Sequence, residues 1–352
     1  MKLLIVEDGP EFVEEIRELV NDLELDVVVA ENAEQAYAAI ANQDFDMAVC
    51  DLVIPASWTA REAHKEHGFG VVDRLRVAMP GVPVVIYSAF GELKDLQDRL
   101  ARAPSHDICG ESATPMVTHR AKSQLVKVAD EIRSYFEGLA ALERMEISPA
   151  IVRTSLNALD RRILRIHARR YGGQLVRATR LASGRSGAAT LLVEVEREDG
   201  SLASRVVAKL NDLGSLEDED EHYDLFVAPL LAATVFTPRI PASVRAGAGR
   251  RGGTLYSLAQ GFDAALFEAL RTDPGSGAAI VAWLREALQP WERAAAGRAV
   301  KVRDIRRTLL PDNRVPNLTA PVPWLTAELE GQTVLVRWGP THGDLHGGNV
   351  LI

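Results

Sequence analysis

The chain has 352 residues, 47% of them hydrophobic and 25% charged, which is enough for two or three globular domains with proper cores. A net charge of −9 argues against a nucleic-acid-binding protein, and no apolar run is long enough to cross a bilayer. Two cysteines, Cys50 and Cys109, are too few for a disulfide framework and fit a reducing compartment. We therefore expect a cytoplasmic protein with neither nucleic acid nor a membrane among its partners.

The first 140 residues alternate short apolar runs with amphipathic segments. The apolar runs predict strands at residues 3–6, 27–30, 47–50, 82–87 and 116–121. The amphipathic segments predict helices at residues 10–23, 33–42, 71–79, 93–103 and 124–142. Strands and helices that alternate in this way predict an α/β fold, a doubly wound five-stranded parallel sheet with helices on both faces.

The pattern changes after residue 140. Residues 141–173 are predicted to form a helical connector, with a helix at 149–170. From residue 174 the pattern favours antiparallel strands, and Glu198-Asp199-Gly200 is a turn signal between two of them. The strands are expected at residues 175–181, 190–195, 204–210 and 254–258. Residues 262–300, rich in alanine and leucine, are again predicted to be helical.

Polar side chains stand at the ends of three predicted strands. Glu7 and Asp8 end the first strand, Asp51 ends the third, and Ser88 ends the fourth. The carboxyl ends of parallel strands meet at one edge of a sheet, so we expect three acids and a hydroxyl to converge there. Paired acids suit a hard cation such as Mg²⁺, and an aspartate carboxylate can attack a phosphoryl group as a nucleophile.

Over residues 1–140 this pattern resembles the receiver domain of two-component response regulators, which has a flavodoxin-like fold. Asp51, in Val-Cys-Asp-Leu-Val-Ile-Pro, matches the phosphorylated aspartate, and Glu7 and Asp8 match the metal-binding acid pair. The backbone carbonyl of Val53 matches the third protein ligand of the Mg²⁺ ion, and Ser88 matches the switch hydroxyl. The resemblance implies phosphorylation by a sensor histidine kinase or a phosphotransfer protein. Since receiver domains often dimerise, it also implies a homodimer.

The sequence departs from the receiver pattern after Asp51. Residues 57–70 insert a charged stretch that contains His64 and His67. These two histidines could bind a metal, but we expect them to lie in an exposed polar loop.

The second departure concerns the lysine of the family, which follows the fifth strand and precedes a proline. We place it at Lys122, with Ser123 after it and His119 at the aromatic switch position three residues before it. This placement requires an insertion between residues 104 and 115. A competing alignment puts Glu111 at the lysine position and would leave the phosphoryl group without its cation. We prefer Lys122 because the last helix of the domain starts directly after it.

The last twelve residues carry a second motif. They read Thr-His-Gly-Asp-Leu-His-Gly-Gly-Asn-Val-Leu-Ile and include His342, Asp344 and Asn349. The motif resembles the catalytic loop of the aminoglycoside phosphotransferase and choline kinase group, relatives of the protein kinases. The resemblance implies that Asp344 accepts the proton of the acceptor hydroxyl and that Asn349 holds a Mg²⁺ ion.

Residues upstream fit the same resemblance in part. Lys209, at the end of Val-Val-Ala-Lys, matches the strand lysine that binds nucleotide phosphates. Gly184 and Gly187 lie where the phosphate-covering loop should be. The resemblance therefore implies ATP as a ligand.

A glutamate partner for Lys209 is also expected. Glu217, Glu219 and Glu221 precede a helix predicted at residues 223–231. We choose Glu221 because it enters that helix.

The resemblance implies a bilobal α+β domain, with an N-lobe at residues 174–260 and a partial C-lobe at residues 261–352. The family carries a further metal-binding aspartate after the asparagine, whereas this sequence ends at Ile352. We therefore expect the chain to be a fragment. Phosphotransferase activity would require that the full-length protein supplies the missing aspartate.

Together these patterns predict a response regulator whose receiver, phosphorylated on Asp51, controls a phosphotransferase-like output domain. The alternative is a pseudokinase scaffold or binding module that the receiver regulates and that transfers no phosphate. A DNA-binding output is disfavoured because no basic helix-turn-helix pattern follows residue 150.

Overall fold

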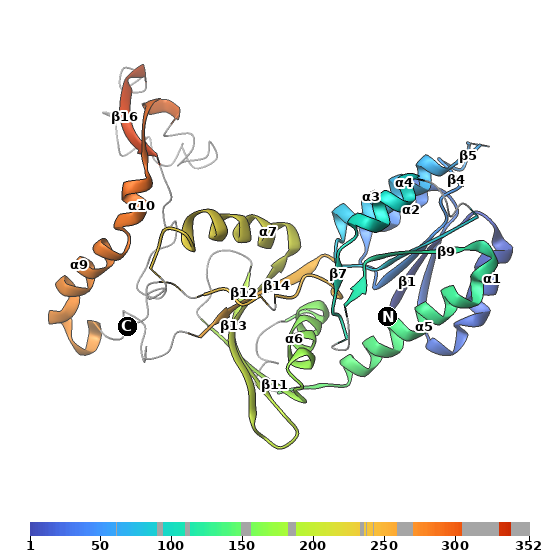
Figure 1. The fold of residues 1–352 in the computed structure, drawn as a ribbon, viewed down its shortest axis with the longest axis horizontal. Coiled ribbons are helices and arrows are strands. Elements are labelled where there is room, and N and C mark those ends of the chain that lie inside the picture. Colours follow the sequence, from blue (N-terminus) through green and yellow to red (C-terminus); the bar gives the residue numbers. More distant parts are fainter. Residues whose placement is uncertain are drawn as a thin grey trace, which may run out of the picture. The chain divides into compact units, whose positions relative to one another are not determined.

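The structure is a computed structural model, and it describes residues 1–60, 62–89, 94–109, 113–148, 156–181, 188–232, 236, 238–241, 243–258, 270–304 and 331–338. The chain divides into two compact units, Met1–Asp220 with Pro238–Leu258, and Glu221–Thr237 with Ala259–Ile352. Figure 1 shows the elements of each unit. Among the described helices, none is long and apolar enough to span a bilayer.

The first sheet of unit 1 has five parallel strands in the order β2-β1-β3-β6-β9, which confirms the predicted sheet. The strands are β1 (Lys2–Val6), β2 (Asp26–Ala30), β3 (Met47–Cys50), β6 (Val84–Ser88) and β9 (Val117–Ala121). Every residue of β3 and β6 is buried, as expected for strands covered on both faces. The strand order reverses at β1, so the crevice at the carboxyl ends of β1 and β3 is where such a sheet binds ligands.

Helices cover both faces of this sheet. They are α1 (Pro10–Leu19), α2 (Ala33–Asn42), α3 (Lys65–Ala78), α4 (Lys94–Arg102) and α5 (Leu125–Glu143). Helices α1 and α5 bury residues such as Ile16 and Phe136 on one face, and α2 buries Ile40 on the other. Asn32 caps α2, because its side chain accepts a hydrogen bond from the backbone N–H of Gln35 at 3.0 Å.

Helix α3 begins at Lys65, six residues earlier than predicted. The expected loop is instead a short hairpin of β4 (Ile54–Pro55) and β5 (Ala63–His64), followed by the first turns of α3. The loop prediction was wrong because glycines disfavour a helix by themselves. Here Gly68 packs on the backbone of Asp51, and this tertiary contact has no room for a side chain.

Between α4 and β9, where we expect an insertion, the chain forms a short two-stranded sheet. Strand β7 (Ser105–His106) pairs with β8 (Thr114–Pro115), and Ile108 between them is buried. Because this segment precedes it in the sequence, the fifth strand of the sheet begins only at residue 117, and β9 ends directly before Lys122.

A second sheet in unit 1 has the order β10-β11-β12-β13-β14. Its strands are β10 (Glu146–Ile147), β11 (Leu175–Arg180), β12 (Ala189–Glu196), β13 (Leu202–Asp212) and β14 (Arg251–Ser257). Strands β11 to β14 are antiparallel to one another, and β10 is parallel to β11. Helix α6 (Ala158–Arg170) contacts β11 and β14, and α7 (Leu213–His222) follows β13.

Helix α7 also begins earlier than predicted, at Leu213 instead of residue 223. The sequence did not predict this start because the helix is mostly acidic. Its buried residues are Leu213 and Leu216, which are too few to give a helical apolar pattern. The chain continues from α7 into a π-helical turn, Tyr223–Val227.

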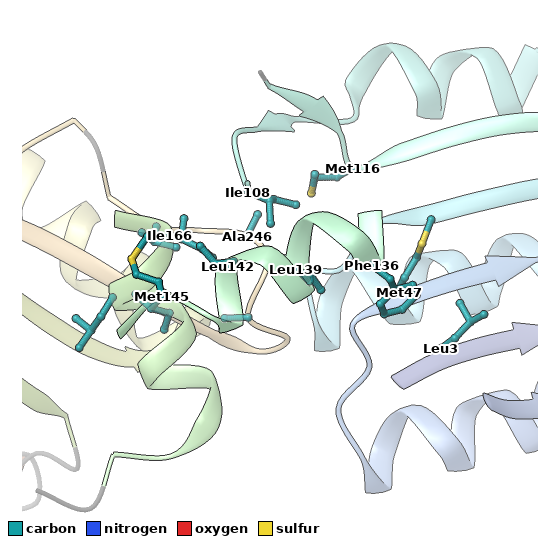
Figure 2. Close-up of a cluster of buried hydrophobic side chains, with 14 of the residues drawn as sticks. Leu3, Met47, Ile108, Met116, Phe136, Leu139, Leu142, Met145, Ile166 and Ala246 are labelled. Carbon is teal, nitrogen blue, oxygen red and sulfur yellow. The ribbon is translucent and has the colours of Figure 1, made fainter. Parts of the chain in front are cut away.

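The two sheets of unit 1 share one hydrophobic core. The end of α5 carries Phe136, Leu139 and Leu142, all of which are buried. The same cluster contains Met47 of the first sheet and Ile166 of α6 (Figure 2). Helix α6, in the predicted connector, is therefore part of this continuous core.

Ion pairs join the two sheets as well. The Arg162 side chain is only 8% exposed and forms ion pairs with Asp46 and, at 2.7 Å, with Glu143. Nε of Arg250 lies 2.5 Å from Oδ1 of Asp44. Asp44 and Asp46 precede β3, so these contacts lie at the amino end of the first sheet.

The described elements of unit 2 include a pair of α-helices and a hairpin. They are α9 (Gly277–Ala287), α10 (Gln289–Ala294), β15 (Ala296–Lys301) and β16 (Thr333–Trp338). The prediction of helix through residue 300 was wrong, because pairing with a strand more than thirty residues later decides the conformation of β15. Residues 341–352, with Asp344 and Asn349, lie outside the described residues.

Candidate functional site

Three acids meet at the carboxyl ends of β1 and β3. Glu7 and Asp8 directly follow β1, and Asp51 directly follows β3. The two strands are neighbours with Val6 opposite Cys50, which brings the three acids together. One carboxylate oxygen of each acid lies within 4.8 Å of the others. Glu7 and Asp51 are buried and Asp8 is exposed, so the cluster opens to solvent at Asp8.

Lys122 places its ammonium group between the two buried acids. Its Nζ lies 2.7 Å from Oδ2 of Asp51 and 2.9 Å and 3.0 Å from the two oxygens of Glu7. The structure thus brings the expected lysine to the expected aspartate. Glu111, the alternative at this position, lies outside the described residues.

Burial has a larger effect than Lys122 on the pKa values of both buried acids. Burial raises the pKa of Glu7 above its ordinary value, and the charge of Asp51 adds to this, while the hydrogen bond from Lys122 opposes it. Burial likewise raises the pKa of Asp51 against the effect of Lys122. Burial lowers the pKa of Lys122, but its bonds to Asp51 and Glu7 outweigh burial and raise the pKa overall. The site therefore favours additional positive charge.

The donor set of this cluster fits Mg²⁺. Glu7, Asp8 and Asp51 offer hard carboxylate oxygens, which Mg²⁺ prefers. Val53 lies in the loop after β3, and its N–H donates to Oδ1 of Asp51 at 3.3 Å, which holds this loop beside the acids. The raised pKa values mean that the ionised acids are disfavoured in this site, and bound Mg²⁺ would stabilise them by its positive charge.

Ser88 lies on β6, the strand next to β3, and His119 lies on β9, the strand beyond β6. Ser88 ends β6, is fully buried, and pairs with Ala121 of β9. His119 lies on β9 and hydrogen-bonds with the backbone of Ser88, and burial lowers its pKa. The structure therefore links the two predicted switch residues through one hydrogen bond.

The contacts of His64 and His67 in the insertion are with residues outside the acid cluster. Nδ1 of His67 is 2.9 Å from the carbonyl oxygen of Ile54, and His64 forms a 3.4 Å ion pair with exposed Glu62. Within the described part of the chain, neither histidine joins a group of three metal-ligating side chains.

Two aromatic residues that the sequence did not indicate complete the site. Phe12 on α1 and Tyr87 on β6 both lie near the Lys122 ammonium. The position of Tyr87 just before Ser88 was the available signal, since it places the ring beside the end of β9. The distance from Phe12 to Lys122 along the chain hid the other contact.

The second sheet carries a lysine–glutamate pair. Nζ of Lys209 lies 2.6 Å from Oε2 of Glu219, and the hydroxyl of Tyr256 donates to Oε1 of Glu219 at 2.9 Å. The choice of Glu221 was wrong. Residues two apart on a helix point in different directions, and the early start of α7 turns Glu219 toward β13 and β14. Gly184 and Gly187 lie outside the described residues.

Comparison with known proteins identifies the first part of the chain. Residues 3–106 match the family model of the response regulator receiver domain. No curated protein sequence matches the chain.

Several similar solved structures are receiver domains. A CheY-like receiver domain protein from Methanospirillum hungatei is 16% identical, with 39% of this chain and 93% of that chain covered and a TM-score of 0.30. The receiver domain of a sensor histidine kinase from Pseudomonas aeruginosa, with a magnesium ion in its active site cleft, is 17% identical, with 39% and 97% covered and a TM-score of 0.28. The receiver domain of a putative Luxo repressor from Vibrio parahaemolyticus is 17% identical, with 40% and 93% covered and a TM-score of 0.30. By its family match, the N-terminal part of the chain is a response regulator receiver domain.

Proposed function

We propose that the chain is a phosphorelay response regulator that accepts a phosphoryl group on Asp51 and controls a kinase-like output domain. The observation that supports it most is the cluster of Glu7, Asp8 and Asp51 within 4.8 Å, with the Lys122 ammonium 2.7 Å from Asp51. The partner would be a sensor histidine kinase or a phosphotransfer protein, as for receiver domains in general.

The chemistry is a direct phosphoryl transfer to a carboxylate. An Asp51 oxygen forms the new bond to phosphorus, the bond from phosphorus to the donor atom breaks, and its electron pair stays on the donor. Lys122 lies where its ammonium can pair with the oxygens of the transferred group. Glu7, Asp8, Asp51 and the Val53 carbonyl would hold Mg²⁺, which supplies charge neutralisation.

Labelling with a small phosphodonor tests the proposal. Incubation with a radiolabelled phosphodonor and Mg²⁺ should label the wild type and leave Asp51→Asn unlabelled. Asp26→Asn, an exposed acid at the start of β2, serves as the matched control and should label like the wild type. Equal labelling of wild type and Asp51→Asn would remove Asp51 from this role.

The output domain is proposed to bind ATP through the second sheet. The pair between Lys209 and Glu219 favours this, because kinase-like folds use such a pair to hold a lysine on nucleotide phosphates. Titration calorimetry with ATP and Mg²⁺ should give binding to the wild type and a large loss of affinity in Lys209→Met. Absence of binding to the wild type would favour the alternative function, a scaffold or binding module that the receiver regulates.

A further inference from the structure

Lys122 stands in a turn without the proline that follows the lysine in receiver domains. Ser123 takes that place, in the short 3-10 helix Lys122–Gln124 between β9 and α5. A proline would fix φ at this point, whereas a serine does not. The lysine side chain is flexible too, since its charge sits at the end of a four-carbon stem. Other contacts must therefore hold the ammonium beside Asp51.

Tyr87 holds the backbone of this turn. It is the residue before the end of β6 and is 1% exposed. Its hydroxyl donates a hydrogen bond to the carbonyl oxygen of Lys122 at 3.1 Å. Burial raises the pKa of Tyr87 to about 12, so the hydroxyl remains a donor at neutral pH.

Two aromatic rings brace the ammonium. Nζ of Lys122 is 4.5 Å from the centroid of the Phe12 ring and 5.6 Å from that of the Tyr87 ring. Both distances lie in the range of cation–π attraction. The rings themselves pack edge to face, with centroids 6.0 Å apart and planes at 71°. Contacts from α1 and β6 thus restrict the ammonium while Glu7 and Asp51 bind it.

We propose that Tyr87 and Phe12 are positioning residues for phosphoryl transfer, which hold Lys122 on the Asp51 carboxylate in place of a proline after the lysine. This inference rests on the proposed function of Asp51 as the phosphoryl acceptor. Both residues contact Lys122, so we expect them to act through the lysine and not on the transferred group itself.

A double-mutant cycle in the full chain tests this role, with the rate constant of Asp51 labelling at saturating phosphodonor and Mg²⁺ as the readout. Tyr87→Phe removes only the hydroxyl and should slow labelling about fivefold to tenfold, the size of one lost hydrogen bond. Phe12→Leu keeps the apolar bulk and should slow labelling about threefold, the size of one cation–π contact. In a Lys122→Met background, Tyr87→Phe should cause no further loss, because no ammonium remains to be held.

Tyr135→Phe is the matched control, since it removes a buried hydroxyl on α5 with no hydrogen-bond partner among the described residues. Its labelling rate should equal that of the wild type. A Tyr87→Phe rate equal to wild type, or the same loss with and without Lys122, would overturn the positioning role. An unlabelled wild type would instead refute the proposed function itself.

Discussion

The acids at the two ends of the receiver sheet differ in how many cationic partners they have. At the amino end, Asp46 and Glu143 share the buried Arg162, and Arg165 also pairs with Glu143, so acids and bases balance. At the carboxyl end, the ion pairs of the buried acids Glu7 and Asp51 are, within the described residues, with Lys122 alone. This difference indicates that the amino-end cluster is structural, and it supports the proposed phosphoryl transfer at the carboxyl-end cluster. A balanced cluster joins two sheets, whereas a cluster with excess negative charge is able to take up a cation and its phosphoryl ligand.

The largest expected effect is at the amino end. Arg162→Ala would leave the largely buried Asp46 without its cation and leave half-buried Glu143 with Arg165 only, so we expect the free energy of unfolding to fall by about 3–5 kcal/mol. Urea unfolding measures this. Arg205→Ala breaks a largely exposed pair with Glu194 and should cost at most about 1 kcal/mol. Equal costs for the two variants would mean that the amino-end cluster does not join the sheets.

The next effect tests the backbone support of Asp51. A methyl group at Gly68 would collide with the backbone of Asp51 and Leu52, so Gly68→Ala should lower the free energy of unfolding by about 1–3 kcal/mol. Gly214→Ala, where a methyl group has open space, should be neutral or stabilise α7 by up to about 1 kcal/mol. If Gly68→Ala instead raises the midpoint of thermal unfolding, α3 does not pack against the backbone of Asp51 at this position.

Removal of Lys122 should increase the excess of negative charge at the carboxyl end of the sheet. Lys122→Met takes one positive charge away from Glu7 and Asp51, so Mg²⁺ should bind about tenfold more tightly. Titration calorimetry with MgCl₂ measures the change. Lys127→Met, an exposed lysine on α5, should leave the affinity unchanged. Weaker Mg²⁺ binding to Lys122→Met would contradict the claim of excess negative charge.

The pH dependence of stability gives the smallest and most selective signal. The pKa of Asp51 is raised in the folded state, so the folded chain holds this proton more tightly than the unfolded chain. Ionisation of Asp51 therefore costs stability as the pH rises above the ordinary value of 3.8. In EDTA, Asp51→Asn should be more stable than the wild type at neutral pH, and the difference should vanish below that value. Denaturant unfolding at a series of pH values measures it, and a less stable Asp51→Asn at neutral pH would reverse the assignment.

The sequence was sufficient to predict the first sheet and the residues at its strand ends. Apolar runs bounded by acids or serine mark where β1, β3 and β6 stop, and this alone predicted that Asp8, Asp51 and Ser88 share one edge. The start of α5 indicated where β9 ends, and so the position of Lys122. These signals are local in the sequence. They are clear because strands that are buried on both faces appear as continuous apolar runs.

The features that the sequence did not reveal depend on contacts between distant segments. Gly68 enters a helix because it packs on Asp51, and Glu219 meets Lys209 because α7 starts early. The shared core of the two sheets was hidden for the same reason, since Ile166 looked like part of a connector. The kinase-like assignment of residues 174–352 stays a prediction.

The central claim is that the acid-rich end of the sheet is the phosphoryl acceptor. Mass spectrometry after treatment with a phosphodonor and Mg²⁺, followed by borohydride reduction of the acyl phosphate, measures this directly. We predict homoserine at position 51, formed only when Mg²⁺ is present. Reduction at another acid, or at no residue of the folded chain, would contradict the account.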